Sequence, residues 1–321
     1  MALFAMQPYN DTPSFTSPGR AAAPPDMPVP DRLNTSLVGM VFAAALALLW
    51  LGSRLTGWAV LVVGIAFSYL QLTNYALLHE ATHGNLRSTR RANYWLGVMT
   101  GLLFPIPFTM VRNTHQGHHD HNRTDGELFD LYYPHDNLII KYVRWYGILC
   151  GLFWPLVPLG ALAYALCPGI LTRAFRYDGV DGYFFGNNRE GTVRAVRLEV
   201  VLMIAFFAAL FWMLDLRWQN TLVLYACFSI NWSTRQYVSH AFSKRDIVEG
   251  AWNLRHLTPM SWLLLHGEYD LNHHRHPEIS WYYLPQLSKP EDVRPSYFRQ
   301  YWKQWLGPRP NLEPEPKRLD S

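Results

Sequence analysis

Charged residues are scarce in this chain. They make up 16% of its 321 residues, whereas 50% are hydrophobic and 15% are aromatic. A typical soluble domain has about 25% charged residues. The composition therefore argues against an ordinary soluble protein and indicates a membrane protein with Trp and Tyr at the membrane surfaces. The net charge of +4 is small and the arginines are dispersed, so nucleic acid is not an expected partner.

Several sequence motifs are also absent. The three cysteines (Cys150, Cys167 and Cys227) lie in apolar stretches without CxxC spacing, which excludes a disulfide framework and a thiolate zinc site. The chain contains no GxGxxG loop that would indicate a bound dinucleotide, and no fused cytochrome or ferredoxin module is visible. The first residues lack a basic-then-apolar pattern, so we expect no secretory signal peptide.

Four apolar segments are long enough to cross a bilayer core of roughly 30 Å. They are residues 36–53, 56–78, 198–214 and 219–236. Their short connections predict two antiparallel hairpins in an all-α integral membrane fold. Arg87, Arg90 and Arg91 follow the second segment and predict that this side is cytoplasmic. We expect a multi-pass protein of the bacterial inner membrane.

Two further apolar segments are interrupted by prolines. Residues 92–111 contain Pro105 and Pro107, and residues 145–170 contain Pro155 and Pro158. A full crossing at 92–111 would separate two histidine clusters, so we interpret both segments as interfacial or re-entrant.

The expected organisation is one membrane domain over residues 34–306, with a cytoplasmic cap formed by its C-terminal part. A flexible polar tail is expected at 1–33 and a second flexible tail at 307–321, because both segments are rich in proline and polar residues.

Histidines gather in three clusters just beyond apolar segments. The first has i, i+4 spacing and the second has i, i+3, i+4 spacing, so on helices each would present its imidazoles on one face. Imidazole is the commonest protein metal ligand, and five or more converging imidazoles would hold two metal ions. The residues are His79 and His83; His115, His118, His119 and His121; and His273, His274 and His276.

These clusters resemble the motifs of the membrane-bound fatty acid desaturase-like superfamily. Its signature is HxxxH, then HxxHH, then a late [HQ]xxHH, with paired transmembrane helices between them. The segments 235–254 and 273–285 also look similar to that superfamily, and the resemblance covers roughly residues 40–290. It implies that the catalytic residues and metal ligands are His79, His83, His115, His118, His119, His273 and His274.

The chain departs from this signature at one position. Asp270 stands where the superfamily usually has His or Gln, three residues before the last histidine pair. Aspartate can bind iron through oxygen or orient a histidine. On a helix His266 would share a face with Asp270 and His273, so it is an alternative ligand. Related enzymes imply His240 as a further ligand.

Other polar residues near the clusters are candidates for hydrogen bonds to ligating imidazoles. They are Glu80, Asp120, Asp125 and Asp246, together with Asn253, which would hold a metal-bound water or serve as an ordinary cap. His121 and His276 fall off the ligand spacing, and His135 and His256 are expected to be structural. Five aromatic residues are candidates for either an acyl tunnel or membrane anchors: Trp95, Phe104, Phe108, Trp232 and Tyr237.

The resemblance implies two iron ions with O2 as co-substrate, since nitrogen-rich ligation suits iron, although imidazole alone does not exclude zinc. The expected function is an oxidoreductase that forms a double bond in a fatty acyl chain within lipid metabolism. A separate ferredoxin, rubredoxin or cytochrome with its reductase would supply electrons.

Histidine spacing leaves other outcomes open. A carotenoid ketolase or hydroxylase, an alkane-type hydroxylase and an alkene-forming fatty acid decarboxylase share comparable chemistry. A non-catalytic membrane metal protein or transporter is a remoter alternative, because a transporter needs ionisable groups within its crossings.

Overall fold

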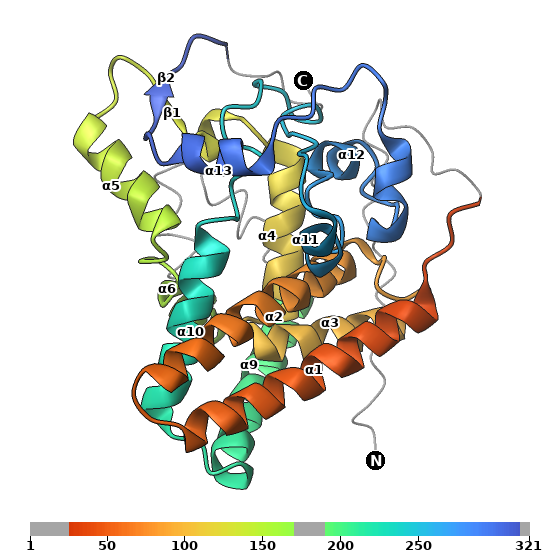
Figure 1. The fold of residues 1–321 in the computed structure, drawn as a ribbon, viewed down its shortest axis with the longest axis vertical. Coiled ribbons are helices and arrows are strands. Elements are labelled where there is room, and N and C mark those ends of the chain that lie inside the picture. The colour runs from red at the N-terminus through yellow and green to blue at the C-terminus, as the bar shows by residue number, and fades with distance from the viewer. Residues whose placement is uncertain (1–25, 170–189, 315–321) are drawn as a thin grey trace.

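The structure is a computed structural model that describes residues 26–169 and 190–314 (Figure 1). Most of the expected N-terminal tail lies outside these residues. The first described helix, α1, is Asp31–Arg54, so regular structure begins three residues before the expected domain boundary. It is followed after a turn at Gly57 by α2, Trp58–His83, which packs along α1.

Within the described residues, three helices are long and apolar enough to cross a membrane: α1, α2 and α9, Glu190–Met213. These helices identify a multi-pass membrane protein. The expected fourth crossing at 219–236 is α10, Trp218–Ser233, which has 16 residues. At 1.5 Å per residue α10 is about 24 Å long, shorter than the roughly 30 Å bilayer core. The expected crossing at 219–236 is therefore not among the helices long enough to span a membrane. Among the described residues a fourth span exists only if a bent helix pair counts as one, and that pair lies in the segment expected to be interfacial or re-entrant.

That bent pair is α3, Arg90–Leu103, followed by α4, Phe108–His121. The two helices meet at 98° around Pro105 and Pro107, because proline removes a backbone donor and clashes with the preceding turn. The predicted interruption of this segment is confirmed. The segment 145–170 is likewise broken, between α5, Leu138–Leu149, and α6, Leu156–Leu166.

The turn between α1 and α2 lies beside the turn between α9 and α10. Arg54 at the end of α1 pairs with Asp215 at 2.9 Å, and Asn220 donates to the carbonyl of Gly52 at 2.7 Å. Along their length α2 and α10 pack together, with buried Phe67 against Tyr225. The central position of α2 fixes where its C-terminal histidines lie.

Short elements gather at the end of the molecule toward which α4 points (Figure 1). They are η1, Asp125–Glu127; β1, Leu131–Tyr132; α11, Thr258–Leu263; α12, Asp270–Arg275; η3, Trp281–Leu287; α13, Tyr297–Gln304; and β2, Arg309–Pro310. β1 and β2 pair in parallel.

The C-terminal segment is attached further than expected. β2 pairs in parallel with β1, and the carboxylate of Glu313 accepts a hydrogen bond from the backbone N–H of Arg245. The prediction of a flexible tail from residue 307 is therefore wrong over residues 307–313, because strand pairing and this hydrogen bond hold them to the body of the protein.

Candidate metal centre

The first histidine group joins three helices. His79 and His83 lie in the last turns of α2, His115 lies in α4 and His273 in α12, and their four ligand nitrogens all lie within 4.8 Å of one another. Helix α2 ends directly after His83 at Gly84, whose φ of 82° suits glycine. The helix end therefore delivers both histidines of the HxxxH motif to one point.

The second group is formed by His118, His240 and His274, whose ligand nitrogens also lie within 4.8 Å of one another. His118 follows His115 of the first group by three residues on α4, and His274 directly follows His273 on α12. His240 comes from the turns after α10, where its backbone N–H bonds the carbonyl of Tyr237. The structure thus places His240, a candidate ligand from the sequence, beside two other candidate ligands.

His119 lies between the two groups. Its Nε2 is 3.1 Å from Nε2 of His115 and 3.0 Å from Nε2 of His273. Its ring centre is 4.4 Å from that of His274 in the second group. The HxxHH spacing of α4 therefore serves both groups from one helix.

These contacts are those expected around cations. Nε2 of His83 lies 2.7 Å from Nε2 of His115, which also faces His119. A neutral imidazole has one N–H and one lone pair, so the Nε2 atoms of His83, His115, His119 and His273 cannot all donate to and accept from one another at these distances. Such converging nitrogens are best satisfied by metal ions. The donor set fits two metals.

The ionisation of His273 suits ligation. Burial and the neighbouring imidazoles of His79 and His83 hold the pKa of His273 well below its usual range. The ring is therefore neutral at pH 7 and keeps a lone pair for a metal.

Two hydrogen bonds orient histidines of the second group. Nδ1 of His118 is 2.6 Å from the carboxylate of Glu127, and Nδ1 of His240 is 3.1 Å from the carbonyl of Gly250. In each ring this leaves Nε2 for a metal, the arrangement that typically fixes the tautomer of a ligating histidine. Glu127 is not among the candidates from the sequence, because η1 brings it back to α4 and no helical spacing predicts that turn.

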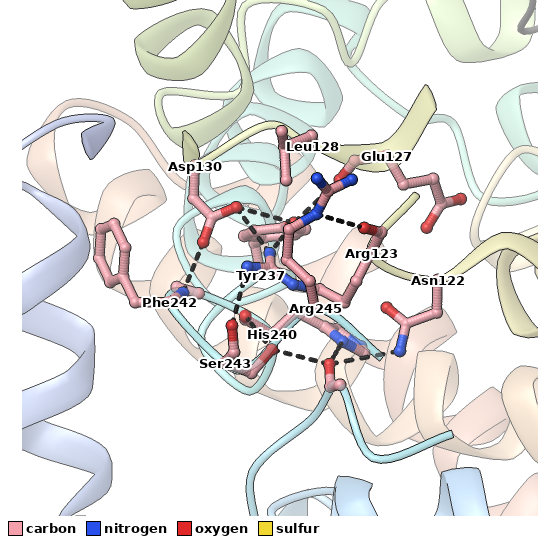
Figure 2. A network of polar contacts seen from close by, with 12 residues as sticks. Asn122, Arg123, Glu127, Leu128, Asp130, Tyr237, His240, Phe242, Ser243 and Arg245 are labelled. Atoms are coloured by element: carbon pink, nitrogen blue, oxygen red, sulfur yellow. Dashed lines mark hydrogen bonds and ion pairs between the residues drawn. The ribbon is translucent and has the colours of Figure 1, made fainter. Parts of the chain in front are cut away.

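A buried polar network supports this group (Figure 2). Arg123 is fully buried; it pairs with Asp130 at 2.6 Å and donates to Tyr237 at 3.0 Å and to the carbonyl of Ser243 at 2.9 Å. The Tyr237 hydroxyl in turn contacts the carbonyl of Glu127 at 3.1 Å. The network ties the segment that carries Glu127 to the segment that carries His240.

Helix α12 is held from both sides. Arg275 pairs with Glu249 at 2.6 Å and Asp292 at 2.8 Å. Asn272 exchanges hydrogen bonds with Asn253, at 2.8 and 3.1 Å. These contacts fix the positions of His273, which belongs to the first group, and of His274, which belongs to the second. Asn253 thus braces α12, and within the part of the chain that the structure describes it makes no hydrogen bond to an imidazole.

The remaining acidic candidates have different surroundings. Glu80 is buried, accepts from the backbone of Trp281 at 3.0 Å, and lies 4.0 Å from Nδ1 of His79. Asp246 accepts from the backbone of Val248 and Glu249. Of these two residues, Glu80 is the one that lies close to a grouped histidine in the described structure.

Asp120 and Asp125 face outward. Both residues are exposed, and Asp125 pairs with Arg245 at 2.6 Å. Asp125 also accepts a hydrogen bond from the Tyr133 hydroxyl at 2.8 Å, and the hydrogen bonds given above for Asp246 come from backbone N–H groups.

His266 and Asp270 separate in the structure. α12 begins at Asp270, and His266 precedes it in a turn with φ of 55°. The shared helical face proposed for them does not exist, so His266 belongs to neither group and instead lies 3.8 Å from the carboxylate of Glu268. Oδ2 of Asp270 lies 2.9 Å from Nε2 of His240.

The aromatic candidates divide between two settings. Phe104 packs against Trp232 and Tyr75, with ring centres 5.4 Å apart in each case, and Tyr75 lies 6.3 Å from His79. Tyr237 belongs to the polar network, and Trp95 is exposed as expected for an anchor. Phe108 is buried against Tyr94.

Comparison with known proteins agrees with this geometry. The family model described as Fatty acid desaturase matches residues 56–305, which include every histidine of both groups. No curated protein is significantly similar to the chain. The matched region covers most of the chain, and the chain belongs to the fatty acid desaturase family.

Proposed function

We propose that this protein is an O2-dependent di-iron membrane oxidase that forms a double bond in a fatty acyl chain. The observation that carries the proposal is the pair of adjacent imidazole groups, joined by His119, at the end of a membrane helix. The family membership supports an oxidoreductase, and nitrogen-rich ligation suits iron.

In this proposal the two groups hold the two irons. His79, His83, His115 and His273 surround one position, and His118, His240 and His274 surround the other, with His119 between them. Bound iron supplies the O2 chemistry needed to remove hydrogen from an unactivated C–H bond. The protein holds the ligands, excludes water and positions the chain.

An apolar wall beside the first group suits such a substrate. Phe104 is 3% exposed and contacts Trp232 and Tyr75, the last of which packs beside His79. We propose that a methylene segment lies against these rings, because apolar surface favours an acyl chain and disfavours water.

The electron donor is proposed to be a separate protein that docks on the cytoplasmic side. Arg90 and Arg91 are exposed at the start of α3, whereas Arg87 already bonds the carbonyl of Asp31. We expect charge reversal at Arg90 and Arg91 to slow reduction by an acidic ferredoxin in a salt-dependent way. Reversal of Arg217, an exposed arginine at the opposite turns, is the control, and equal rates for all variants would contradict this docking.

The function is tested by expressing the chain in a lipid-producing host and measuring iron content and lipid products together. We expect two irons per chain and new double bonds in the acyl chains. The folded His118→Ala variant should lose the double bonds and the iron of the second group. An oxygenated lipid or a terminal alkene in place of the double bond would reject desaturation but keep the oxidase. Zinc in place of iron, with no product, would reject the proposal.

A further inference from the structure

A carboxyl group is buried inside one of the apolar helices. Glu199 lies within Thr192–Met213, the apolar part of α9, and is 2% exposed. Its Oε1 accepts hydrogen bonds from the hydroxyl groups of Tyr94 and Thr109, each at 2.7 Å, and its Oε2 accepts from the backbone N–H of Thr109 at 2.8 Å. An acidic residue within a membrane span is costly and usually has a function, so this arrangement calls for a reason beyond packing.

The contacts of Glu199 lie at the start of α4. Thr109 is the second residue of that helix, so its N–H belongs to the first turn and has no helical acceptor. Pro107 precedes the helix and has no polar side-chain atom that could cap it. Inside a membrane no water replaces the missing partner, and the N-terminus of a helix favours a nearby negative charge. Glu199 therefore caps α4 from another helix.

The other side of the break between α3 and α4 is held by different helices. Leu103 is the last residue of α3, and the residue four positions later is Pro107, which has no N–H to donate to the Leu103 carbonyl. Gln71 of α2 donates to this carbonyl at 3.2 Å, and the Tyr225 hydroxyl of α10 donates to it at 3.0 Å. The end of α3 is thus tied to α2 and α10, whereas the start of α4 is tied to α9 through Glu199.

The position of α4 matters to both histidine groups. This helix carries His115 of the first group, His118 of the second and His119 between them. Thr109 precedes His115 by six residues, which is about 9 Å along a helix. A shift or rotation of α4 at its start would move the three imidazoles together, away from their neighbours on α2 and α12.

We propose that Glu199 is a positioning residue of the metal centre. It fixes where α4 begins and thereby holds the three histidines of α4 against those of the other helices. This inference rests on the proposed function, because that function requires both groups to bind metal. If Glu199 were only one of the hydrogen bonds that join helices in a membrane, its loss would lower stability without changing the metal sites.

The test titrates purified, metal-free protein in detergent with Co²⁺, whose visible absorption spectrum reports the geometry of its ligands. Glu199→Ala is expected to bind Co²⁺ about tenfold more weakly at both groups and to change the spectrum. Glu199→Gln keeps one accepting oxygen but turns an amide donor toward a donor of Thr109, so a smaller loss is expected. Tyr225→Phe is the matched control, because it removes a hydrogen bond from the other side of the same break. It should lower the unfolding temperature and keep the wild-type affinity and spectrum.

Wild-type affinity and spectrum in the folded Glu199→Ala variant would overturn the proposal. Equal losses of affinity in Glu199→Ala and Tyr225→Phe would overturn it too, because ordinary helix packing would then explain both. If Glu199→Ala does not fold, Glu199→Gln decides, and an unchanged affinity and spectrum there would overturn the proposal equally.

The proposed function can fail separately. Weaker Co²⁺ binding by the Glu199 variants of a protein whose wild type oxidises no lipid would support this inference while rejecting that function. A wild-type protein that forms double bonds, with Glu199 variants whose metal sites are unchanged, would keep the function and overturn this inference.

Discussion

The two histidine groups are built in different ways. The first consists of imidazoles from three helices, with His79 and His83 one turn apart on α2. The second takes His240 from irregular chain after α10 and relies on Glu127, Gly250 and the Arg123 network to orient its rings. Helices therefore aim most of the first group, in which α12 is held by polar contacts, whereas the second group relies on polar contacts for His118 and His240 as well.

His119 offers the most severe test of this difference because it touches both groups. We expect His119→Ala to lower metal binding at both sites, whereas His240→Ala lowers it at the second site alone. Each loss should exceed the about 10–100-fold that removal of an outer hydrogen-bond partner costs. Metal titration of the purified variants checks this, and full occupancy of either site in His119→Ala would contradict the shared role.

The Arg123 network should contribute more to stability than an exposed pair of similar length. Arg123→Met leaves Asp130 buried without its cation and is expected to cost about 3–5 kcal/mol. Arg54→Met breaks the Asp215 pair, which is partly exposed to solvent, and should cost at most about 1 kcal/mol. Thermal unfolding in detergent compares them, and equal losses would show that the network is not a stabilising unit.

Glu127 should affect one group and spare the other. Glu127→Gln weakens the acceptor that orients His118, so we expect about 10–100-fold weaker metal binding at the second group. Occupancy of the first group should not change. Competitive chelator titration resolves the two sites, with Glu278→Gln at an exposed position as the control. Equal weakening of both sites would show that the groups are not separately supported.

Acidification should produce the smallest effect, and its sign follows from His273. The pKa of His273 is lowered in the folded protein. In the unfolded chain a histidine has its ordinary pKa of about 6.5, so below that pH the unfolded chain binds a proton at His273 more readily than the folded protein does. The associated stability is present above that pH and is lost as the pH falls. Unfolding temperatures of metal-free protein should therefore decline below pH 6.5, and a flat profile down to pH 5 would contradict this.

Much of the arrangement was predictable from local patterns. The helical spacing of His115, His118 and His119 and the break at Pro105 and Pro107 depend on residues close in sequence, and both are present in the structure. The apolar segments likewise predicted the long helices. These features are determined within a few turns of chain.

Features that depend on turns were not predictable in this way. The failed alignment of His266 with Asp270 arose because the chain reverses between them, with φ of 55° at His266. Glu127 reaches His118 through η1, and α10 stops early because the chain turns after Ser233. Each error concerns where a helix begins or ends, which tertiary contacts decide more than local preference.

The order in which the histidines are synthesised has a consequence for the assembly of the two histidine groups. His79 and His83 are made first, but both groups need α12, and the strand pairing of β2 with β1 comes last of all. The first two histidines therefore precede α12 by nearly two hundred residues of synthesis. The proposed metal loading would then be a late step of biogenesis, because a chain that is cut short before α12 lacks His273 and His274.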